Sequence, residues 1–451
     1  MATTGVNLAS LLLDHPFGDD EPLLHSMDRT MTAGEARTAA RRVADELGGV
    51  SGRAVGVALP NGPDLVVAMM GIWIAGGVYI PVNPRLPVGE VAAVMNQTAP
   101  VAMIAAAGVD RLVSQRTYDE GIAFVTWTSG TTGAPKPIHH RHAGYVELLD
   151  RVLEPLRGGG ATRRPPSPNL IPVSMTLNAG LYNALFGLRA GAALVIMDRF
   201  EPHDLATLVQ RHQIRSTVLP PAAMVALTDS DIESLEPLKY VRSITAPLSP
   251  LHARRFADRF SVFVLNGYGQ AEMGEVIGWT AADAREHPEQ LGAVGRPHPG
   301  VDIRIAADGH LWVRPPNAAA GIADRTDAEG YIDTGDLARV DADGFVWIEG
   351  RAGDVINRGG NKVHPEAVEE VLRLSPAVDD VAVVARPDDR LGEVPVACLV
   401  GRPVDDAVLD ALCRDHLVAY KVPVAFVWME ALPHNEIGKI LRPELTRRLS
   451  L

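Results

Sequence analysis

The segment TSGTTGAPKP, residues Thr128–Pro137, combines hydroxyl side chains with two glycines and one lysine. Hydroxyl groups and glycine N–H groups can surround a polyphosphate, and Lys136 can balance part of its charge. A Walker A loop needs Ser or Thr directly after its lysine, whereas Pro137 follows here. We therefore interpret the segment as a phosphate-binding loop of another kind, in which Pro137 removes one backbone donor and restricts Lys136 to extended geometry.

The composition is that of a globular protein with room for several domains. The chain has 451 residues, of which 47% are hydrophobic and 22% charged. This length predicts roughly two to four domains. With 42 basic and 55 acidic residues the net charge is -13. That balance argues against nucleic acid as a partner, because binding to phosphate backbones needs clustered Lys and Arg.

The cysteines and the N-terminal segment indicate a cytoplasmic protein. Cys398 and Cys413 form no CxxC pair, which favours reduced, buried thiols. The segment MATTGVNLAS has neither the basic nor the apolar region of a signal peptide. Residues 65–84 carry no charge over a length that could cross a membrane, but glycines and prolines interrupt them. We expect a buried helix, a glycine turn and a short strand there, and no membrane span.

Apolar periodicity predicts an α/β fold that changes character near residue 350. Helical patterns occupy 33–47 and 202–212, and strand-like patterns occupy 54–60, 193–198 and 216–220. From 292 to 350, short strands with turns at 307–309 and 341–344 predict a small β unit. Beyond 351 the pattern is mixed again, with helices at 365–374 and 404–416 and a strand at 382–385.

Further motifs follow the phosphate loop in a fixed order, and each supplies a group that nucleotide chemistry needs. Tyr268 offers a flat face for a base, and Glu272 offers an oxygen ligand for Mg²⁺. Asp336 and Arg351 can bond ribose hydroxyls, and Lys439 can reach a developing negative charge. The motifs are NGYGQAE (266–272), LGAVGRPHPG (291–300), YIDTGD (331–336), IEGRAGDVINRGGNKVHPEAVE (348–369) and PHNEIGKILRPEL (433–445).

This ordered set resembles the core motifs of the adenylate-forming (ANL) superfamily, which comprises acyl-CoA synthetases, carrier-protein-loading adenylation domains and luciferases. The resemblance extends from about Gly52 to Leu445. It implies a large N-terminal domain (1–352) of two αβ subdomains and a small β-barrel, followed by a small mobile α+β C-terminal domain (353–451). It also implies a stand-alone acyl-CoA ligase that uses ATP, Mg²⁺ and coenzyme A, passes through an acyl-adenylate and releases AMP.

The resemblance assigns roles to individual positions of this sequence. Lys439, Lys136 and Glu272 would be catalytic, with Glu272 also holding the metal, and Asp354 would be the hinge. The nucleotide would contact Thr128, Ser129, Gly130, Thr131, Thr132, Gly133, Gly267, Tyr268, Gly269, Asp336 and Arg351. The acyl pocket would comprise Met175, Asn178, Gly180, Tyr182, Asn183, Ala246 and Asn266, although the asparagines can equally be structural groups bonded to backbone. Coenzyme A would pass Gly359, Gly360, Asn361 and Lys362.

Three positions depart from the superfamily pattern. Pro137 replaces a glycine, Ala271 replaces a threonine whose hydroxyl would contact the α-phosphate, and Met175 lies where acyl-CoA ligases often have a histidine. Because two departures face the phosphates, an enzyme with weak or absent adenylation that accepts a pre-formed acyl-adenylate is an alternative to the complete ligase. A non-catalytic nucleotide-binding pseudoenzyme is a second alternative, against which Lys136, Glu272 and Lys439 argue.

The candidate acyl-pocket segments favour a plain carboxylic acid as substrate. Residues 175–182 and 243–247 contain no acidic side chain to pair an amino-acid ammonium group. The compact scaffold resembles ligases of actinobacterial natural-product pathways, including those for diterpenoid acids of the platensimycin type. The thiol is that of coenzyme A or a carrier protein, and the chain is expected to be a monomer or a homodimer.

Overall fold

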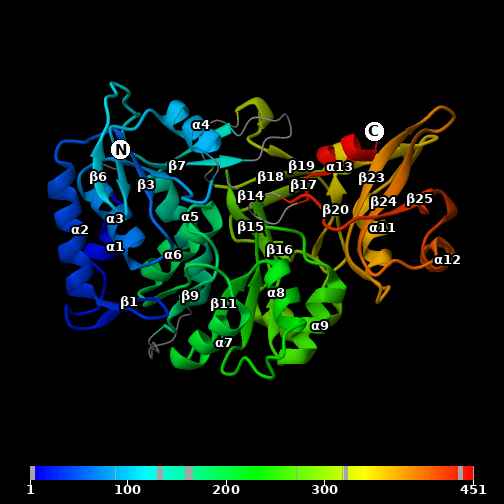
Figure 1. Cartoon of the computed structure of the whole chain (residues 1–451), viewed down its shortest axis with the longest axis horizontal. Helices are drawn as coiled ribbons and strands as arrows, with labels where there is room; N and C mark the ends of the chain where they lie inside the picture. The colour runs from blue at the N-terminus through cyan, green and yellow to red at the C-terminus, as the bar shows by residue number, and fades with distance from the viewer. Residues whose placement is uncertain are drawn as a thin grey trace.

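The computed structural model describes residues 6–86, 88–128, 136–157, 166–270, 272–316, 318, 323–434 and 440–449. Figure 1 shows the N-terminal segments at one end of the molecule, the C-terminal segments at the other, and the middle of the chain between them. The architecture is mixed α/β with several separate sheets, as the sequence predicted.

The first large sheet has the strand order β6-β5-β3-β4-β7-β8. Its central strands are parallel, and its edge strands β6 and β8 are antiparallel to their neighbours. The expected strand at 54–60 is β3. The strands are β3 (Ala54–Ala58), β4 (Val78–Pro81), β5 (Ala102–Ala105), β6 (Gly108–Arg111), β7 (Ile122–Thr128) and β8 (Lys136–Arg141).

The second large sheet has the order β13-β12-β11-β9-β10-β1-β2 and is parallel except for β2. The predicted strands at 193–198 and 216–220 form β10 and β11, so both are confirmed. The strands are β1 (Pro22–His25), β2 (Thr30–Thr32), β9 (Asn169–Ile171), β10 (Leu194–Ile196), β11 (Ser216–Leu219), β12 (Tyr240–Ser243) and β13 (Phe263–Leu265).

Helices cover both sheets, and the helix α2 (Ala33–Leu47) has the bounds that the sequence predicted. Thr32 begins it through a capping box with Glu35, which satisfies two backbone donors. The other helices of this part are α1 (Ser10–Leu13), α3 (Pro63–Ile74), α4 (Val88–Thr98), α5 (His142–Arg157), α6 (Asn178–Ala190), α7 (Pro202–Arg211), α8 (Pro221–Thr228), α9 (Pro250–Phe260) and α10 (Ala281–Glu286).

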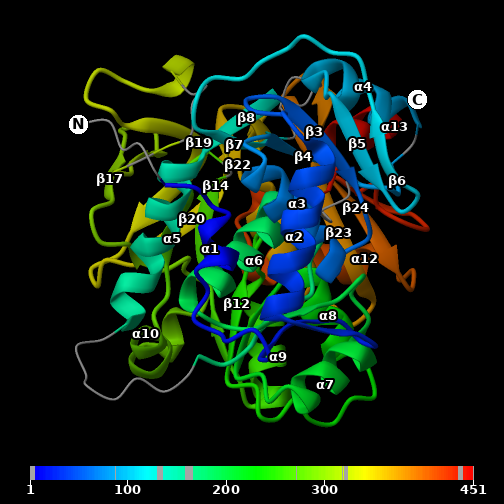
Figure 2. The same cartoon turned by 90° about the vertical axis from the view of Figure 1, so that its left-hand side faces the viewer.

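The uncharged segment 65–84 is a core element. It forms most of α3, a turn at Gly76-Gly77 and the strand β4, and residues 65–73 are buried. Figure 2 shows α3 beside α2, and the two helices are in contact. In the described ranges, no helix combines the length and the apolar composition that a membrane crossing requires. Burial against α2 and the sheets explains the missing charges.

The β unit after residue 266 consists of two small antiparallel sheets. One has the order β14-β15-β16, with β14 (Gly267–Gln270), β15 (Gly274–Gly278) and β16 (Arg296–Pro297). The other has the order β17-β18-β19-β20, with β17 (Asp302–Ile305), β18 (His310–Arg314), β19 (Ile332–Val340) and β20 (Val346–Arg351). The expectation of a small β-barrel is therefore wrong. An isolated bridge between Gly295 and Val346 joins the regions of the two small sheets, but the strands of the described residues do not close into a ring.

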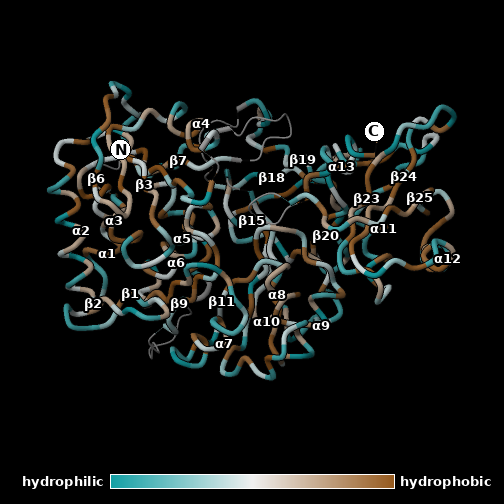
Figure 3. The backbone as a smooth tube through the Cα atoms, viewed as in Figure 1, coloured by the Kyte–Doolittle hydropathy of each residue, from teal (hydrophilic) through white to brown (hydrophobic). Residues whose placement is uncertain are grey.

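The C-terminal part is a sheet with helices on both faces. Its strands are β21 (Ile356–Arg358), β22 (Asn361–Val363), β23 (Val378–Asp388), β24 (Gly392–Gly401) and β25 (Ala425–Trp428), and its helices are α11 (Pro365–Leu372), α12 (Asp406–His416) and α13 (Arg442–Leu449). Along β23, Val381 and Val383 enter one apolar cluster while Ala382 and Val384 enter another, as strand alternation requires. Figure 3 shows hydrophobic residues along β23 and β24. The boundary between residues 352 and 353 stays a prediction.

Candidate active site

The phosphate-loop motif connects two strands at the edge of the first sheet. Thr128 ends β7 and lies opposite Lys136, which begins β8. Residues Ser129, Gly130, Thr131, Thr132 and Gly133 lie outside the described residues, as do Ala271 and Lys439. Pro137 is exposed on β8, which is an edge strand. Edge strands accept proline because one side of the strand has no ladder to complete. The fold thus accommodates Pro137 without breaking a central ladder.

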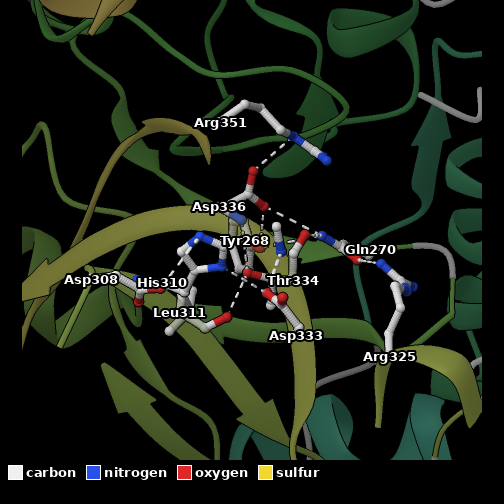
Figure 4. Close-up of polar contacts among 11 residues, drawn as sticks. Tyr268, Gln270, Asp308, His310, Leu311, Arg325, Asp333, Thr334, Asp336 and Arg351 are labelled. Atoms are coloured by element: carbon white, nitrogen blue, oxygen red, sulfur yellow. Dashed lines mark hydrogen bonds and ion pairs between the residues drawn. The ribbon is translucent and has the colours of Figure 1, made fainter. Parts of the chain in front are cut away.

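Tyr268 and Asp336 meet across the two small sheets. Tyr268 lies on β14, and its hydroxyl donates a hydrogen bond to Asp336 Oδ2. Asp336 lies on β19, is almost fully buried, and receives an ion pair from Arg351 Nε to its Oδ1 at 2.7 Å. Burial raises the pKa of Tyr268 well above its usual value, and the charge of Asp336 raises it further. Figure 4 shows Asp336 between the tyrosine and the arginine.

Strand register explains why Asp336 and Arg351 are adjacent. They lie opposite each other on the antiparallel strands β19 and β20, where directly opposed side chains of opposite charge stabilise the sheet. Thr334 holds the backbone next to Asp336 in place. Its hydroxyl donates a hydrogen bond to Leu311 O at 2.7 Å and accepts one from Asp336 N at 3.1 Å. The predicted nucleotide residues Tyr268, Asp336 and Arg351 are therefore brought together by the fold.

Gln270 and Arg325 extend this polar network and were not among the predicted site residues. Gln270 Nε2 donates to Thr334 O at 2.8 Å and to Asp336 Oδ2 at 3.3 Å. Arg325 donates to Gln270 Oε1 at 3.3 Å and to Glu272 Oε1 at 2.9 Å, which places its guanidinium beside both neighbours of residue 271. Figure 4 shows the link between Arg325 and Gln270. Gln270 stands inside a quoted motif, whereas no pattern singled out Arg325.

Glu272 is the predicted magnesium ligand, and whether it binds the metal stays a prediction. Mg²⁺ is usually held by one or two carboxylates together with substrate phosphates and waters, so one carboxylate suffices. Within the described ranges no group of three or more His, Cys, Asp and Glu side chains could hold a metal ion by itself. The Glu272 side chain is only 12% exposed and is paired with Arg325, so its carboxylate is held in place.

The predicted acyl-pocket asparagines are engaged within the protein. Asn183 donates to Ala179 O at 2.7 Å, and Asn266 donates to Ala293 O at 3.2 Å and accepts from Gly267 N. Asn178 accepts a hydrogen bond from Tyr145 at 3.1 Å. Asn183 and Asn266 are both buried and bonded to backbone, as the structural alternative expects. Their place in the acyl pocket stays a prediction.

The remaining predicted pocket residues lie around the start of α6 and the end of β12. Met175 is fully buried, and its N–H donates to Asn61 Oδ1 at 2.9 Å. A Cβ at Gly180 would lie 2.1 Å from Ser174 O, so only glycine fits there. Ala246 follows β12. Tyr182 differs from the others, because its buried hydroxyl has no hydrogen-bond partner in the part of the chain that the structure describes.

The predicted coenzyme A and hinge residues lie near the start of the C-terminal part. Gly359 and Gly360 have φ values of 57° and 87° in the turn between β21 and β22, a conformation that favours glycine. Asn361 and Lys362 are exposed on β22. Asp354 ends a short 3₁₀ helix after β20, and its Oδ2 lies 3.6 Å from Arg442 Nε.

Two family models match this chain. The family model described as AMP-binding enzyme matches residues 16–322, and the model of the AMP-binding enzyme C-terminal domain matches residues 367–439. The chain belongs to the AMP-binding enzyme family.

Several curated and solved proteins are similar to this AMP-binding enzyme. A 3-[(3aS,4S,7aS)-7a-methyl-1,5-dioxo-octahydro-1H-inden-4-yl]propanoyl:CoA ligase of Mycobacterium tuberculosis is 29% identical, over 94% of this chain and 95% of its own length. A 4-coumarate–CoA ligase of Pinus taeda is 26% identical, over 96% and 92%. ATP-bound MatB from Rhodopseudomonas palustris has the same fold, with a TM-score of 0.86 and 22% identity over 99% of both chains.

Proposed function

We propose that this AMP-binding enzyme is an acyl-CoA ligase that joins a carboxylic acid to coenzyme A through an acyl-adenylate. The observation that carries the proposal is the network of Tyr268, Asp336 and Arg351 in a chain that contains both family regions. The named CoA ligases that match 94% and 96% of the chain act on acids and coenzyme A, and we extend that reaction type to this protein.

In the first half-reaction, a carboxylate oxygen attacks the α-phosphorus of ATP. The new P–O bond forms as the bond to the β-phosphate oxygen breaks, and pyrophosphate leaves. Tyr268 would support the adenine ring, while Asp336 and Arg351 would bond the ribose hydroxyls. The hydrogen bonds within this network hold the side chains in place before the nucleotide binds, so little ordering remains to be done on binding.

Charge on the phosphates would be met by cations of this chain. Lys136 would contact the phosphates from the start of β8, and Lys439 would approach the α-phosphate. Arg325 would add a guanidinium beside residue 271, where alanine supplies no hydroxyl. When bound, Mg²⁺ would neutralise phosphate charge, with Glu272 as its protein ligand.

In the second half-reaction, the thiolate of coenzyme A attacks the acyl carbon, and AMP leaves as the C–O bond of the mixed anhydride breaks. AMP is a good leaving group, so positioning and thiolate formation from a thiol of pKa about 8.5 suffice. The exposed turn Gly359–Lys362 would guide the thiol, and Asp354 would absorb the dihedral change between the two steps.

The complete reaction is favoured over an enzyme that has lost adenylation. The hypothesis of lost adenylation relied on Pro137 and Ala271. Pro137 lies on an edge strand, where a proline is tolerated, so it gives no structural reason to expect a loss of adenylation. Beside Ala271, Arg325 supplies a cation through its contacts with Gln270 and Glu272. Retention of Lys136, Glu272 and Lys439 likewise favours an active ligase over a pseudoenzyme.

Two parallel assays test the proposal. In the first, the protein is supplied with ATP, Mg²⁺ and a panel of carboxylic acids, and pyrophosphate is measured. In the second, a synthetic acyl-adenylate and coenzyme A are supplied, and the thioester is measured. We expect both products. Thioester without pyrophosphate from any acid would support the adenylation-deficient alternative, and pyrophosphate without thioester would exclude the ligase assignment.

A further inference from the structure

A charged cluster that no sequence motif singled out lies between α6, β12 and β15. Arg242, on β12, donates to Glu275 Oε1 at 2.6 Å and to Trp279 O at 3.1 Å. His298, directly after β16, lies 2.9 Å from the same carboxylate oxygen through its Nε2. The three side chains are 21%, 14% and 12% exposed, in the order Arg242, Glu275 and His298.

The neighbouring backbone leaves room for this cluster. Gly267 and Gly278 lie opposite each other on β14 and β15. A Cβ at Gly278 would lie 2.4 Å from Glu275 Oε1 and 3.0 Å from the His298 ring, and a Cβ at Gly267 would lie 3.2 Å from the Glu275 carboxyl carbon. Glycine at these two positions lets the carboxylate and the ring pack directly against the strands of the nucleotide motif, and a side chain at Gly278 would displace the Glu275 carboxylate.

Glu275 is an anion, and only one of its two carboxylate oxygens takes part in the hydrogen bonds of this cluster. Burial by itself would raise the pKa of Glu275, but the charge of Arg242 and the hydrogen bond with His298 outweigh it and lower the pKa. In the described part of the chain every hydrogen bond of this carboxylate goes to Oε1, which leaves Oε2 as an available acceptor. Because Arg242 already balances the charge, the cluster does not call for a second cation.

Tyr182 presents a hydroxyl to the same region. It projects from α6. Burial raises the pKa of its hydroxyl, the nearby charge of Glu275 raises it further, and Arg242 and Arg151 act in the opposite direction. Its hydroxyl is buried and lacks a partner among the described residues, as do the hydroxyls of Ser243 and Thr245 at the end of β12. A buried polar group without a partner costs free energy unless a ligand or water satisfies it.

The backbone at the end of β12 is strained in the same place. Thr245 has a φ of 74°, which is a rare conformation for a β-branched residue. Strain of this kind gathers at ligand sites, where the surrounding structure holds it. The orphaned hydroxyls and the strained residue therefore point to a ligand.

We infer that Tyr182 and Glu275 form a polar wall of the acyl site that selects carboxylic acids carrying a hydroxyl group away from the carboxylate. A hydroxyl can accept a hydrogen bond from Tyr182 and donate one to Glu275 Oε2, so it satisfies both groups. A ketone can accept a hydrogen bond from Tyr182 but cannot donate one to Glu275. An ammonium group would gain little from Glu275, because the charge of that carboxylate is already balanced by Arg242. This inference rests on the proposed function, since it names the class of acid that the ligase takes.

The test compares pairs of acids that differ only in that hydroxyl. Pyrophosphate release is measured with each hydroxy acid and its deoxy analogue, and binding of the same pairs is followed through the thermal unfolding midpoint. The hydroxy member should be preferred by about tenfold to a hundredfold in kcat/KM, the usual worth of a hydrogen bond to a charged group. Tyr182→Phe and Glu275→Gln should each bring the preference close to one.

A matched control is available in Tyr79, whose buried hydroxyl on β4 also has no partner in the described ranges but lies in the core of the first sheet. Tyr79→Phe should leave the preference unchanged. Equal use of both members of every pair, or preference for the ketone, by an enzyme that forms thioesters would overturn the inference while leaving the ligase intact. Failure to form any thioester would instead contradict the proposed function.

Discussion

Replacing Arg442 with methionine should destabilise the C-terminal part of the protein. Arg442 begins α13, and its guanidinium donates to Glu369 Oε1 and to Val383 O, both at 2.6 Å. It also lies 3.5 Å from Glu366 Oε1 and 3.6 Å from Asp354 Oδ2. One largely buried cation, 16% exposed, therefore connects α13, α11, β23 and the predicted hinge residue.

The magnitude follows from what the substitution leaves behind. The Glu369 side chain is only 3% exposed, so its carboxylate would remain buried without its main counter-charge. Removing one member of a buried ion pair typically costs about 3–5 kcal/mol. Arg373 Nη2 lies 3.6 Å from Glu369 Oε2, and Val383 N still donates to Glu369 Oε1. Because these contacts persist, we expect a loss near about 3 kcal/mol.

Hydrogen exchange followed by mass spectrometry measures this loss for the region concerned. Peptides that cover β23 and β24 should lose about two decades of protection, since one decade corresponds to about 1.4 kcal/mol. Peptides from α2 and α3, at the other end of the molecule, serve as the internal control.

A second variant separates charge burial from lost packing. In Arg442→Met combined with Glu369→Met, both members of the pair are apolar, and most of the protection should return. If the double variant exchanges as fast as Arg442→Met alone, the uncompensated carboxylate is not the cause, and the reasoning is refuted.

Three further predictions follow from other sites. Burial raises the pKa of Glu366 to about 7, so its ionisation lowers the stability of the folded protein as the pH rises from 4.5 to 7. The free energy of unfolding of Glu366→Gln, measured in urea, should exceed that of the wild type by up to about 3 kcal/mol at pH 8 and equal it below pH 4.5. Asp336→Asn removes the anion that meets Tyr268 and Arg351 and should weaken AMP binding by calorimetry about tenfold or more, with unchanged affinity as the contrary result. A Cβ at Gly269 would lie 2.0 Å from Gly274 O, so Gly269→Ala should lower both the affinity for AMP and the thermal unfolding midpoint. Gly89→Ala is the control, because a Cβ at Gly89 meets nothing within 4 Å, and it should change neither quantity.

Local signals in the sequence predicted the elements well where one rule dominated. The helix α2 has the predicted bounds because an amphipathic period and a capping box coincide at its start. The uncharged segment 65–84 gave a buried helix, a turn and a strand, because glycine and proline interrupt it. The expectation of a closed barrel was wrong, because closure depends on strand twist and on register between segments far apart, which no local pattern reports.

The sequence by itself determined the family, because its motifs recur in a fixed order along the chain, and the matched family regions at 16–322 and 367–439 agree. It also named Tyr268, Asp336 and Arg351 as groups for one nucleotide. Only the tertiary structure decided which side chains meet: that Arg325 pairs with Glu272, and that Arg242 and His298 converge on Glu275. Such contacts depend on strand register and on how separate sheets pack, so no local pattern in the chain carries them.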